Sequence, residues 1–265
     1  MTDYSLAISE AEIRRYQLMA ERAQVVEADL WRQAGIQPGA RVADVGCGPA
    51  AISVVLGRAV EPAGEVIGVE RDEASLAAAR QLVGESGLGN VQLRAGTATD
   101  GGIAAGSVDV AMCRNVLAHN GPDEQRIVDH LADICRPGGV VYLVDVDGTA
   151  MRLLDIDPEL SDLNDRYLEF HRRRGNDLQT GLRLGKLLGA AGLEVLAHRG
   201  TYNIIPAPPG LRPPPWAARQ AMLDDGVISQ EDIQRWERAF DRMDTASTRP
   251  TVFAPQFVAL GRKPG

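Results

Sequence analysis

The sequence has few cysteines and no long apolar run. No stretch of its 265 residues reaches the roughly 18 apolar residues of a membrane-spanning helix, so no membrane span is expected. Its three cysteines are far apart and form no metal-binding pattern, which suits a reducing compartment and predicts no metal site. Residues 1–6 lack the basic start and apolar block of a signal peptide, and the expected location is therefore the cytoplasm.

The chain also lacks an excess of positive charge. It holds 28 Lys and Arg against 36 Asp and Glu, a net charge of −8 at pH 7. Since a nucleic-acid enzyme usually carries a basic face, no nucleic-acid partner is expected, and a small uncharged or cationic compound suits this surface better. The 45% of apolar residues is typical of globular domains and is enough for a full core.

What the sequence does contain is an apolar strand that ends in a glycine turn and leads into a helix, within residues 41–51. Gly46 and Gly48, on either side of Cys47, let the backbone pass close to a ligand. A second apolar run ends in Glu70, 22 residues after Gly48, where a nucleoside cofactor would present its ribose hydroxyls. As an ionised carboxylate, Glu70 would accept strong hydrogen bonds from both hydroxyls.

This turn resembles the first motif of the class I S-adenosyl-L-methionine-dependent methyltransferases, roughly (V/L)-D-x-G-C-G-x-G. The match runs over residues 42–50, with Asp44 inside the strand and Ala50 where a third glycine is usual. We expect Ala50 to cost no more than the clearance of one methyl group. The resemblance extends through residues 113–119 and 136–145.

The resemblance implies an α/β fold: a Rossmann-like, seven-stranded, mainly parallel sheet with an antiparallel last strand, helices on both faces and helical lid insertions. The expected parts are a helical cap over residues 1–34, a cofactor-binding core over 35–150, and the remaining strands over 151–265 with lid insertions at 151–192 and 206–248. Strands two to seven are expected at residues 65–70, 91–95, 108–113, 140–144, 194–205 and 251–260.

The resemblance also implies the cofactor, S-adenosyl-L-methionine, and its contacts. They are expected at Asp44, Gly46, Cys47, Gly48, Glu70, Arg71, Gly96, Thr97, Ala98, Asn115 and Tyr16. Relatives commonly place an Asp where Thr97 stands, so the adenine contact falls to the Thr97 hydroxyl or to the backbone of residues 96–98. Asn115 is placed to meet the methionine ammonium. Tyr16, on an amino-terminal helix that starts at a capping box, either contacts the ligand or packs in the core.

The implied reaction is direct in-line methyl transfer to a small-molecule acceptor, a natural product or a quinone-like metabolite. His119 lies near the same sheet edge, and an imidazole is a natural group to take a proton from a hydroxyl acceptor, although packing is the alternative role. Asp145 and Asp147 follow the fifth strand as in metal-dependent catechol-type methyltransferases. The Asp-Asn pair that those enzymes add is missing here, so no metal is expected.

Several points stay open at this stage. Residues 46–51 and Glu70 also fit a nicotinamide-dependent oxidoreductase, but Asp44 and the Arg-Pro-Gly-Gly turn at 136–139 speak against that class. A cyclase-like protein that binds the cofactor without methyl transfer also fits the glycine turn. Met222, Trp236, Phe240 and Met243 either line the acceptor cavity or form the core of a lid. The sequence leaves open whether O, C or N is methylated, and also the oligomeric state, a homodimer included.

Overall fold

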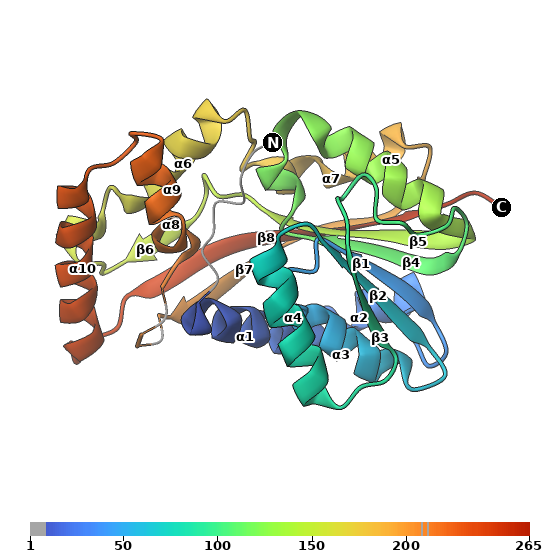
Figure 1. The fold of residues 1–265 in the computed structure, drawn as a ribbon. Coiled ribbons are helices and arrows are strands. Elements are labelled where there is room, and N and C mark those ends of the chain that lie inside the picture. The colour runs from blue at the N-terminus through green and yellow to red at the C-terminus, as the bar shows by residue number, and fades with distance from the viewer. Residues whose placement is uncertain (1–8, 208, 211) are drawn as a thin grey trace.

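The fold is built on one eight-stranded sheet. The computed structural model describes residues 9–265 except 208 and 211, so the expected cap is described only from residue 9, and the segment assessed for a signal peptide lies outside the described residues. The strand order is β3-β2-β1-β4-β5-β8-β6, and β7 pairs with β8 (Figure 1). The strands are β1 Arg41–Val45, β2 Glu65–Glu70, β3 Val91–Ala95, β4 Val108–Arg114, β5 Cys135–Val146, β6 Arg152–Leu154, β7 Glu194–Pro206 and β8 Thr251–Arg262.

Strands β1 to β5 run parallel, and β8 is antiparallel to β5, which confirms the predicted fold class. The expected count of seven strands was one too low, because β6 was not anticipated. This strand has three residues and pairs with residues 251–253 of β8, while β5 pairs with residues 256–262. So short a segment, partly exposed, is too brief to show the alternation by which a strand is recognised.

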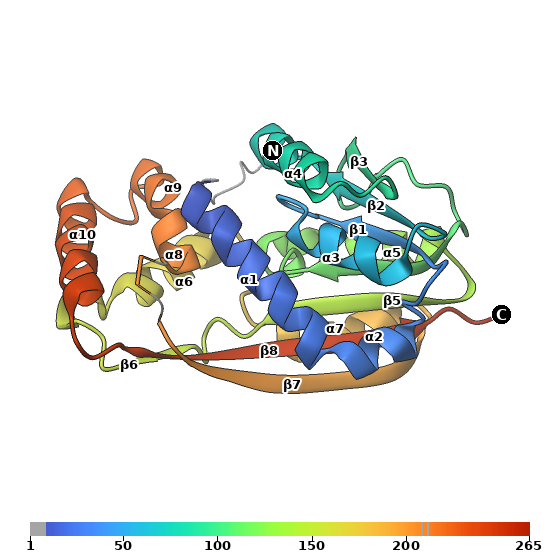
Figure 2. The same ribbon diagram turned by 90° about the horizontal axis from the view of Figure 1, so that it is seen from below.

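Helices cover both faces of the sheet. One face carries α1 Glu10–Val26, α2 Ala28–Ala34, α3 Ala51–Val60 and α4 Glu73–Ser86, and the other carries α5 Glu124–Ile134 and α7 Leu184–Ala190 (Figures 1 and 2). The sequence predicted one continuous helix from the capping box to about residue 31, but it breaks at Glu27, where α1 ends and α2 begins. None of the helices in the described ranges is both long and apolar enough to cross a membrane.

Several of the other helices gather beyond one end of the sheet (Figures 1 and 2). They are η3 Pro158–Leu160, α6 Leu163–Arg173, α8 Pro214–Ala217, α9 Arg219–Asp224 and α10 Gln230–Thr245. Met222, Trp236 and Phe240 are buried in a separate apolar cluster among these helices, with Met243 packed against it. We call this group of helices the lid cluster. By contrast α7, which falls inside the expected insertion at 151–192, packs against the sheet.

Candidate cofactor and acceptor site

The glycine turn after β1 depends on backbone conformations that favour glycine. Gly46 has a φ of +76° and Gly48 a φ of +54°. A β-carbon added at Gly46 would lie 2.5 Å from Val116 Cγ2, so this position requires glycine for space as well as for conformation. Ala50 also has a positive φ, of 61°. The expectation that Ala50 costs only clearance was therefore wrong, because it also costs backbone strain. Helix α3 begins after it, at Ala51.

Glu70 ties the ends of β1 and β2 together. Its carboxylate is 7% exposed, and Oε2 accepts a hydrogen bond from the Gly48 backbone N at 2.9 Å. Oε1 accepts from the backbone N of Arg71 at 2.8 Å and of Asp72 at 2.9 Å. A carboxylate offers about four lone-pair sites, so capacity remains for a hydroxyl group.

Asp44 is a second acid beside the turn. It is 1% exposed, and its Oδ2 accepts from the Ser53 hydroxyl at 2.5 Å. Burial raises the pKa of Asp44 to about 6, against the opposing effects of the Ser53 hydrogen bond and the Arg114 charge. Because a buried carboxylate is stabilised by a nearby cation, a positively charged ligand would favour the ionised form of Asp44.

These residues line one pocket at the carboxyl ends of β1, β2 and β4. Its lining includes the expected Asp44, Gly46, Cys47, Gly48, Glu70, Arg71, Gly96, Ala98, Asn115, Tyr16 and His119. Thr97 does not line it. Instead Thr97 forms a β-bridge with Asp100, and its hydroxyl lies 3.3 Å from that of Thr99. Sequence reasoning missed the lining residues Met19, Ala20, Ala51, Ile52, Val69, Arg114, Val116 and Asn120.

Asn115 is the first residue after β4 and adopts a strained backbone conformation. Its φ is +54°, and its backbone N donates to the Val144 carbonyl at 2.8 Å. Within the described residues, its side-chain Oδ1 is buried without a hydrogen-bond partner. A buried acceptor in this state costs about 1–3 kcal/mol unless a ligand or water donates to it. This pocket therefore suits a ligand with a donor group, such as an ammonium.

His119 lies at the end of the 3₁₀ turn η1, Leu117–His119, and borders the pocket. Burial, followed by the charges of Arg15 and Arg71, lowers the pKa of His119 to about 4. The ring is therefore neutral at pH 7 and can accept a hydrogen bond, but it is a weaker base than an ordinary imidazole. Its predicted role as a base stays a prediction.

Asp145 and Asp147, considered above as metal ligands, hold loops together in the structure. The buried Asp145 carboxylate accepts from the backbone N of Ala118 at 3.1 Å and of Val146 at 2.9 Å, which fixes η1 against β5. Burial raises the pKa of Asp145 to about 7. Asp147 Oδ1 accepts from the Thr149 hydroxyl at 2.6 Å. In the part of the chain that the structure describes, no cluster of three or more His, Cys, Asp or Glu is arranged to hold a metal ion.

A buried ion pair fixes the amino-terminal helices over the pocket. Glu27, at the junction of α1 and α2, accepts from Arg114 at 2.7 and 3.0 Å and from the Tyr142 hydroxyl at 2.8 Å. The side chains of Arg114 and Glu27 are only 9% and 5% exposed. This anchor holds α1 where Tyr16 and Met19 border the pocket.

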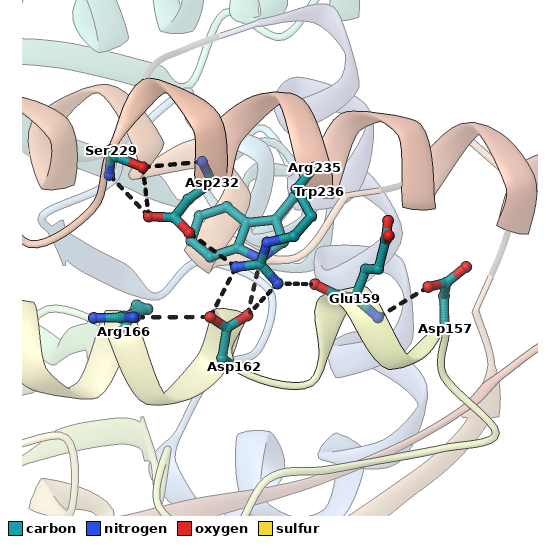
Figure 3. Close-up of polar contacts among 8 residues, drawn as sticks. All are labelled: Asp157, Glu159, Asp162, Arg166, Ser229, Asp232, Arg235 and Trp236. Carbon is teal, nitrogen blue, oxygen red and sulfur yellow. Dashed lines mark hydrogen bonds and ion pairs between the residues drawn. The ribbon is translucent and has the colours of Figure 1, made fainter.

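Ion pairs also join the helices of the lid cluster (Figure 3). Asp162, just before α6, accepts from Arg235 of α10 at 2.8 Å and from the indole of Trp236 at 3.0 Å. Arg235 also donates to Asp232 at 2.9 Å and to the Glu159 carbonyl at 2.6 Å. The segment around η3 and α6 is thus linked to α10 through Arg235 and Trp236, and Arg242 of the same helix also pairs with Asp157 and Glu159.

The sheet order, the glycine turn after β1 and the acid at the end of β2 together define a Rossmann-like protein of the class I methyltransferase type. The chain belongs to the methyltransferase domain family, whose model matches residues 36–188, and the predicted family is confirmed. Over 117 residues the chain is 33% identical to the demethylmenaquinone methyltransferase of Geobacillus kaustophilus, covering 44% of this chain and 50% of that one. The chain thus spans about half the length of this curated relative.

Two solved structures share the fold. Geranyl diphosphate methyltransferase in complex with S-adenosylmethionine has a TM-score of 0.54 and 13% identity, covering 93% of this chain and 85% of that one. The [4+2]-cyclase SpnF has a TM-score of 0.55 and 17% identity, covering 91% of this chain and 82% of that one. Since the two names denote different reactions, the function has to be argued from the site.

Proposed function

We propose that the protein is an S-adenosyl-L-methionine-dependent methyltransferase that acts on a small-molecule acceptor, a natural product or a quinone-like metabolite. The observation that carries this proposal is the hydrogen bond from Gly48 N to the buried Glu70 carboxylate at the edge of the pocket. It joins a backbone turn suited to close ligand approach with an acid suited to ribose hydroxyls. Asp44 adds a second acid that suits a positively charged cofactor. The quinone-like acceptor rests on the resemblance to a demethylmenaquinone methyltransferase.

In this proposal each part of the pocket holds one part of the cofactor. Glu70 binds the ribose, the backbone of residues 96–98 borders the adenine, and Asn115 Oδ1 accepts from the ammonium group. The bound cofactor supplies a methyl group already activated on a cationic sulfur. The task left to the protein is to align the acceptor with that methyl group and to exclude water. Helix α1 and the lid cluster perform this task. Helix α7, which packs against the sheet, takes no part in it.

The alternative is a protein that binds the cofactor without methyl transfer. The observation that favours it is the shared fold with the cyclase SpnF. The site of the present chain fits both functions, since both require the same cofactor pocket. The family match speaks against the third candidate, a nicotinamide-dependent oxidoreductase.

Calorimetry with S-adenosylhomocysteine and with NADH tests the proposed cofactor. We expect binding of S-adenosylhomocysteine alone, and a loss of at least about tenfold in its affinity for Glu70→Ala, because charged hydrogen bonds contribute about 1.5–3 kcal/mol. Glu73→Ala is the matched control, since this carboxylate is exposed and pairs with Arg80 at the surface. Equal affinity of the parent and Glu70→Ala would refute the assignment of the ribose site.

Mass spectrometry with cofactor carrying a labelled methyl group tests the transfer. A panel of hydroxylated, amine and quinol compounds is incubated with the protein, and the expected result is a product heavier by one labelled methyl. A product that forms without the label, while S-adenosylhomocysteine binds, would instead support the cyclase-like function.

A further inference from the structure

Two histidines from different parts of the molecule meet behind the pocket. His119 comes from η1 and borders the pocket, whereas His171 comes from α6 of the lid cluster. Their ring centroids are 4.8 Å apart. The rings of Tyr167 and Phe170 pack edge-on against His171, with centroids 4.4 and 4.9 Å away. The lid cluster therefore reaches the pocket wall through an aromatic and imidazole contact.

The histidine pair carries unused hydrogen-bonding capacity. His171 is 1% exposed, and its Nδ1 lies 2.9 Å from Asn176 Nδ2. Among the residues that the structure describes, His171 Nε2 and His119 Nδ1 are buried without a hydrogen-bond partner, and so is Asn164 Oδ1. Asn164, Tyr167 and His171 share one side of α6 by their i, i+3 and i+7 spacing. Buried polar atoms rarely stay unpaired, so several such atoms on neighbouring elements indicate a place where another molecule supplies the partners.

The surroundings of His119 and His171 favour an uncharged ligand over a cation. The charged groups that act on His119 are Arg15 of α1 and Arg71 of the segment after β2. Arg15 pairs with Glu12 at 2.8 Å, and the backbone N of Arg71 is held by Glu70. Since His119 Nδ1 and His171 Nε2 have no carboxylate partner among the described residues, an ammonium ion beside these rings would lose hydration without gaining a counter-ion.

We propose that His119, oriented by His171, forms the polar end of an acceptor subsite that binds an uncharged compound through a hydroxyl group. This inference rests on the proposed function and names its acceptor class. A hydroxyl both donates and accepts, so it can use either protonation pattern of a neutral imidazole. Of the two classes that the net charge left open, the site thus selects the uncharged acceptor over the cationic one. His171 is a positioning residue, because it acts through His119.

The first experiment measures selectivity with three matched probes. Protein saturated with S-adenosylhomocysteine is titrated with 2-naphthol, 2-methylnaphthalene and 2-naphthylmethylammonium by saturation-transfer NMR. We expect 2-naphthol to bind about tenfold more tightly than 2-methylnaphthalene, since one buried hydrogen bond distinguishes them, and the ammonium probe to bind most weakly. Equal affinities, or a preference for the ammonium probe, would overturn the proposal.

Variants then test which histidine causes the preference for 2-naphthol over 2-methylnaphthalene. His171→Phe keeps an aromatic ring in the cluster and is expected to reduce the naphthol preference to about twofold or less, whereas His119→Gln keeps a hydrogen-bonding group and retains part of it. His130→Phe is the matched control: His130 lies on α5, and its Nε2 is likewise buried without a partner within the described ranges. A preference that survives in His171→Phe, or is lost in the control as well, would contradict the assignment.

A spectroscopic measurement on the unmodified protein covers the case in which a variant fails to fold. In protein with ¹⁵N-labelled histidine, 2-naphthol should shift the ring nitrogen resonances of His119 and His171 and leave those of His130 unchanged. Unshifted His119 resonances with bound naphthol would refute the subsite. Cofactor binding is measured first in each sample, so failure to bind S-adenosylhomocysteine counts against the proposed function, and binding without hydroxyl selectivity counts against the subsite alone.

Discussion

The cofactor pocket and the lid cluster are built by different means. The pocket is formed largely by backbone: positive φ angles at Gly46 and Gly48, and main-chain N–H groups around Glu70. The helices of the lid cluster are joined by side chains: Arg235 forms a salt bridge with Asp162, and Arg174 forms one with Asp225. A site made of backbone restricts which residues can occupy it, while a contact between long side chains can be replaced in many ways. The family model, which ends at residue 188, covers the glycine turn and Glu70 together with η3 and α6 of the lid cluster, and leaves out α8, α9 and α10.

The largest effect should come from breaking the buried ion pair between Glu27 and Arg114, which anchors α1 and α2 beside the pocket. Glu27→Ala leaves the Arg114 charge buried without its carboxylate, and we expect a loss of about 3–5 kcal/mol in the free energy of unfolding, measured by urea denaturation. Glu65→Ala removes the partner of Arg41 at a half-exposed site and should cost less than about 1 kcal/mol. Equal losses for the two variants would show that the anchor has no special role.

The backbone side of the comparison is tested at Gly46. Gly46→Ala should lower the free energy of unfolding by about 2–4 kcal/mol, because of the left-handed φ and the contact with Val116. Adding Val116→Ala should recover the part due to crowding and leave the part due to conformation. Gly189→Ala is the control, since nothing lies within 4 Å of the added carbon in α7. A harmless Gly46→Ala would mean that the turn is not restricted in the way proposed.

The dependence of folding stability on pH tests the burial of His171 in the lid cluster. Burial, followed by the charges of His119 and Arg174, lowers the pKa of His171 to about 3. The unfolded chain, with a histidine pKa of about 6.5, therefore binds more protons between these values, so stability must fall as the pH drops through this range. Between pH 7 and pH 5, His171→Phe should lose about 1–2 kcal/mol less than the parent, by thermal unfolding at each pH. His198→Phe, on β7, is the comparison variant.

The smallest effect is expected in the side-chain network of Figure 3. Asp162→Asn keeps an acceptor for the Trp236 indole but removes the charge that Arg235 binds, and should cost about 1 kcal/mol. Affinity for S-adenosylhomocysteine, measured by calorimetry, should stay unchanged. A large loss of that affinity would show that the lid cluster and the pocket are energetically coupled, contrary to the division drawn above.

Much of the core could be predicted from sequence because apolar runs and turn residues encode it locally. Strand β3 matches its expected bounds, and α4 is capped within its own sequence by Asp72, which accepts from Ser75 N. The break at Glu27 could not be foreseen, since it depends on Arg114 and Tyr142 more than 80 residues further along the chain. Local patterns do not record such distant partners.

The candidate site follows the same rule. Gly46 and Glu70 line the pocket, and their spacing along the sequence follows from a strand, a turn and a helix. Asn115 and Thr97 were placed by the resemblance to a family; Asn115 lines the pocket, whereas Thr97 forms a bridge with Asp100 and does not. His171 was missed because nothing near it in the sequence indicates that α6 packs against η1.

The pairing of Pro206 with Thr251 makes residues 207–250 an insertion between the two strands of a β-hairpin. Ala207 N donates to the Pro250 carbonyl at 2.8 Å, so the chain leaves β7 and returns to β8 at nearly the same point. Removing the carboxyl-terminal part of the protein would take β8 with it and open the sheet. Splicing a two-residue turn between residues 206 and 251 would instead spare every strand, but it would remove α10 and uncover the apolar residues of η3 and α6 that pack against it.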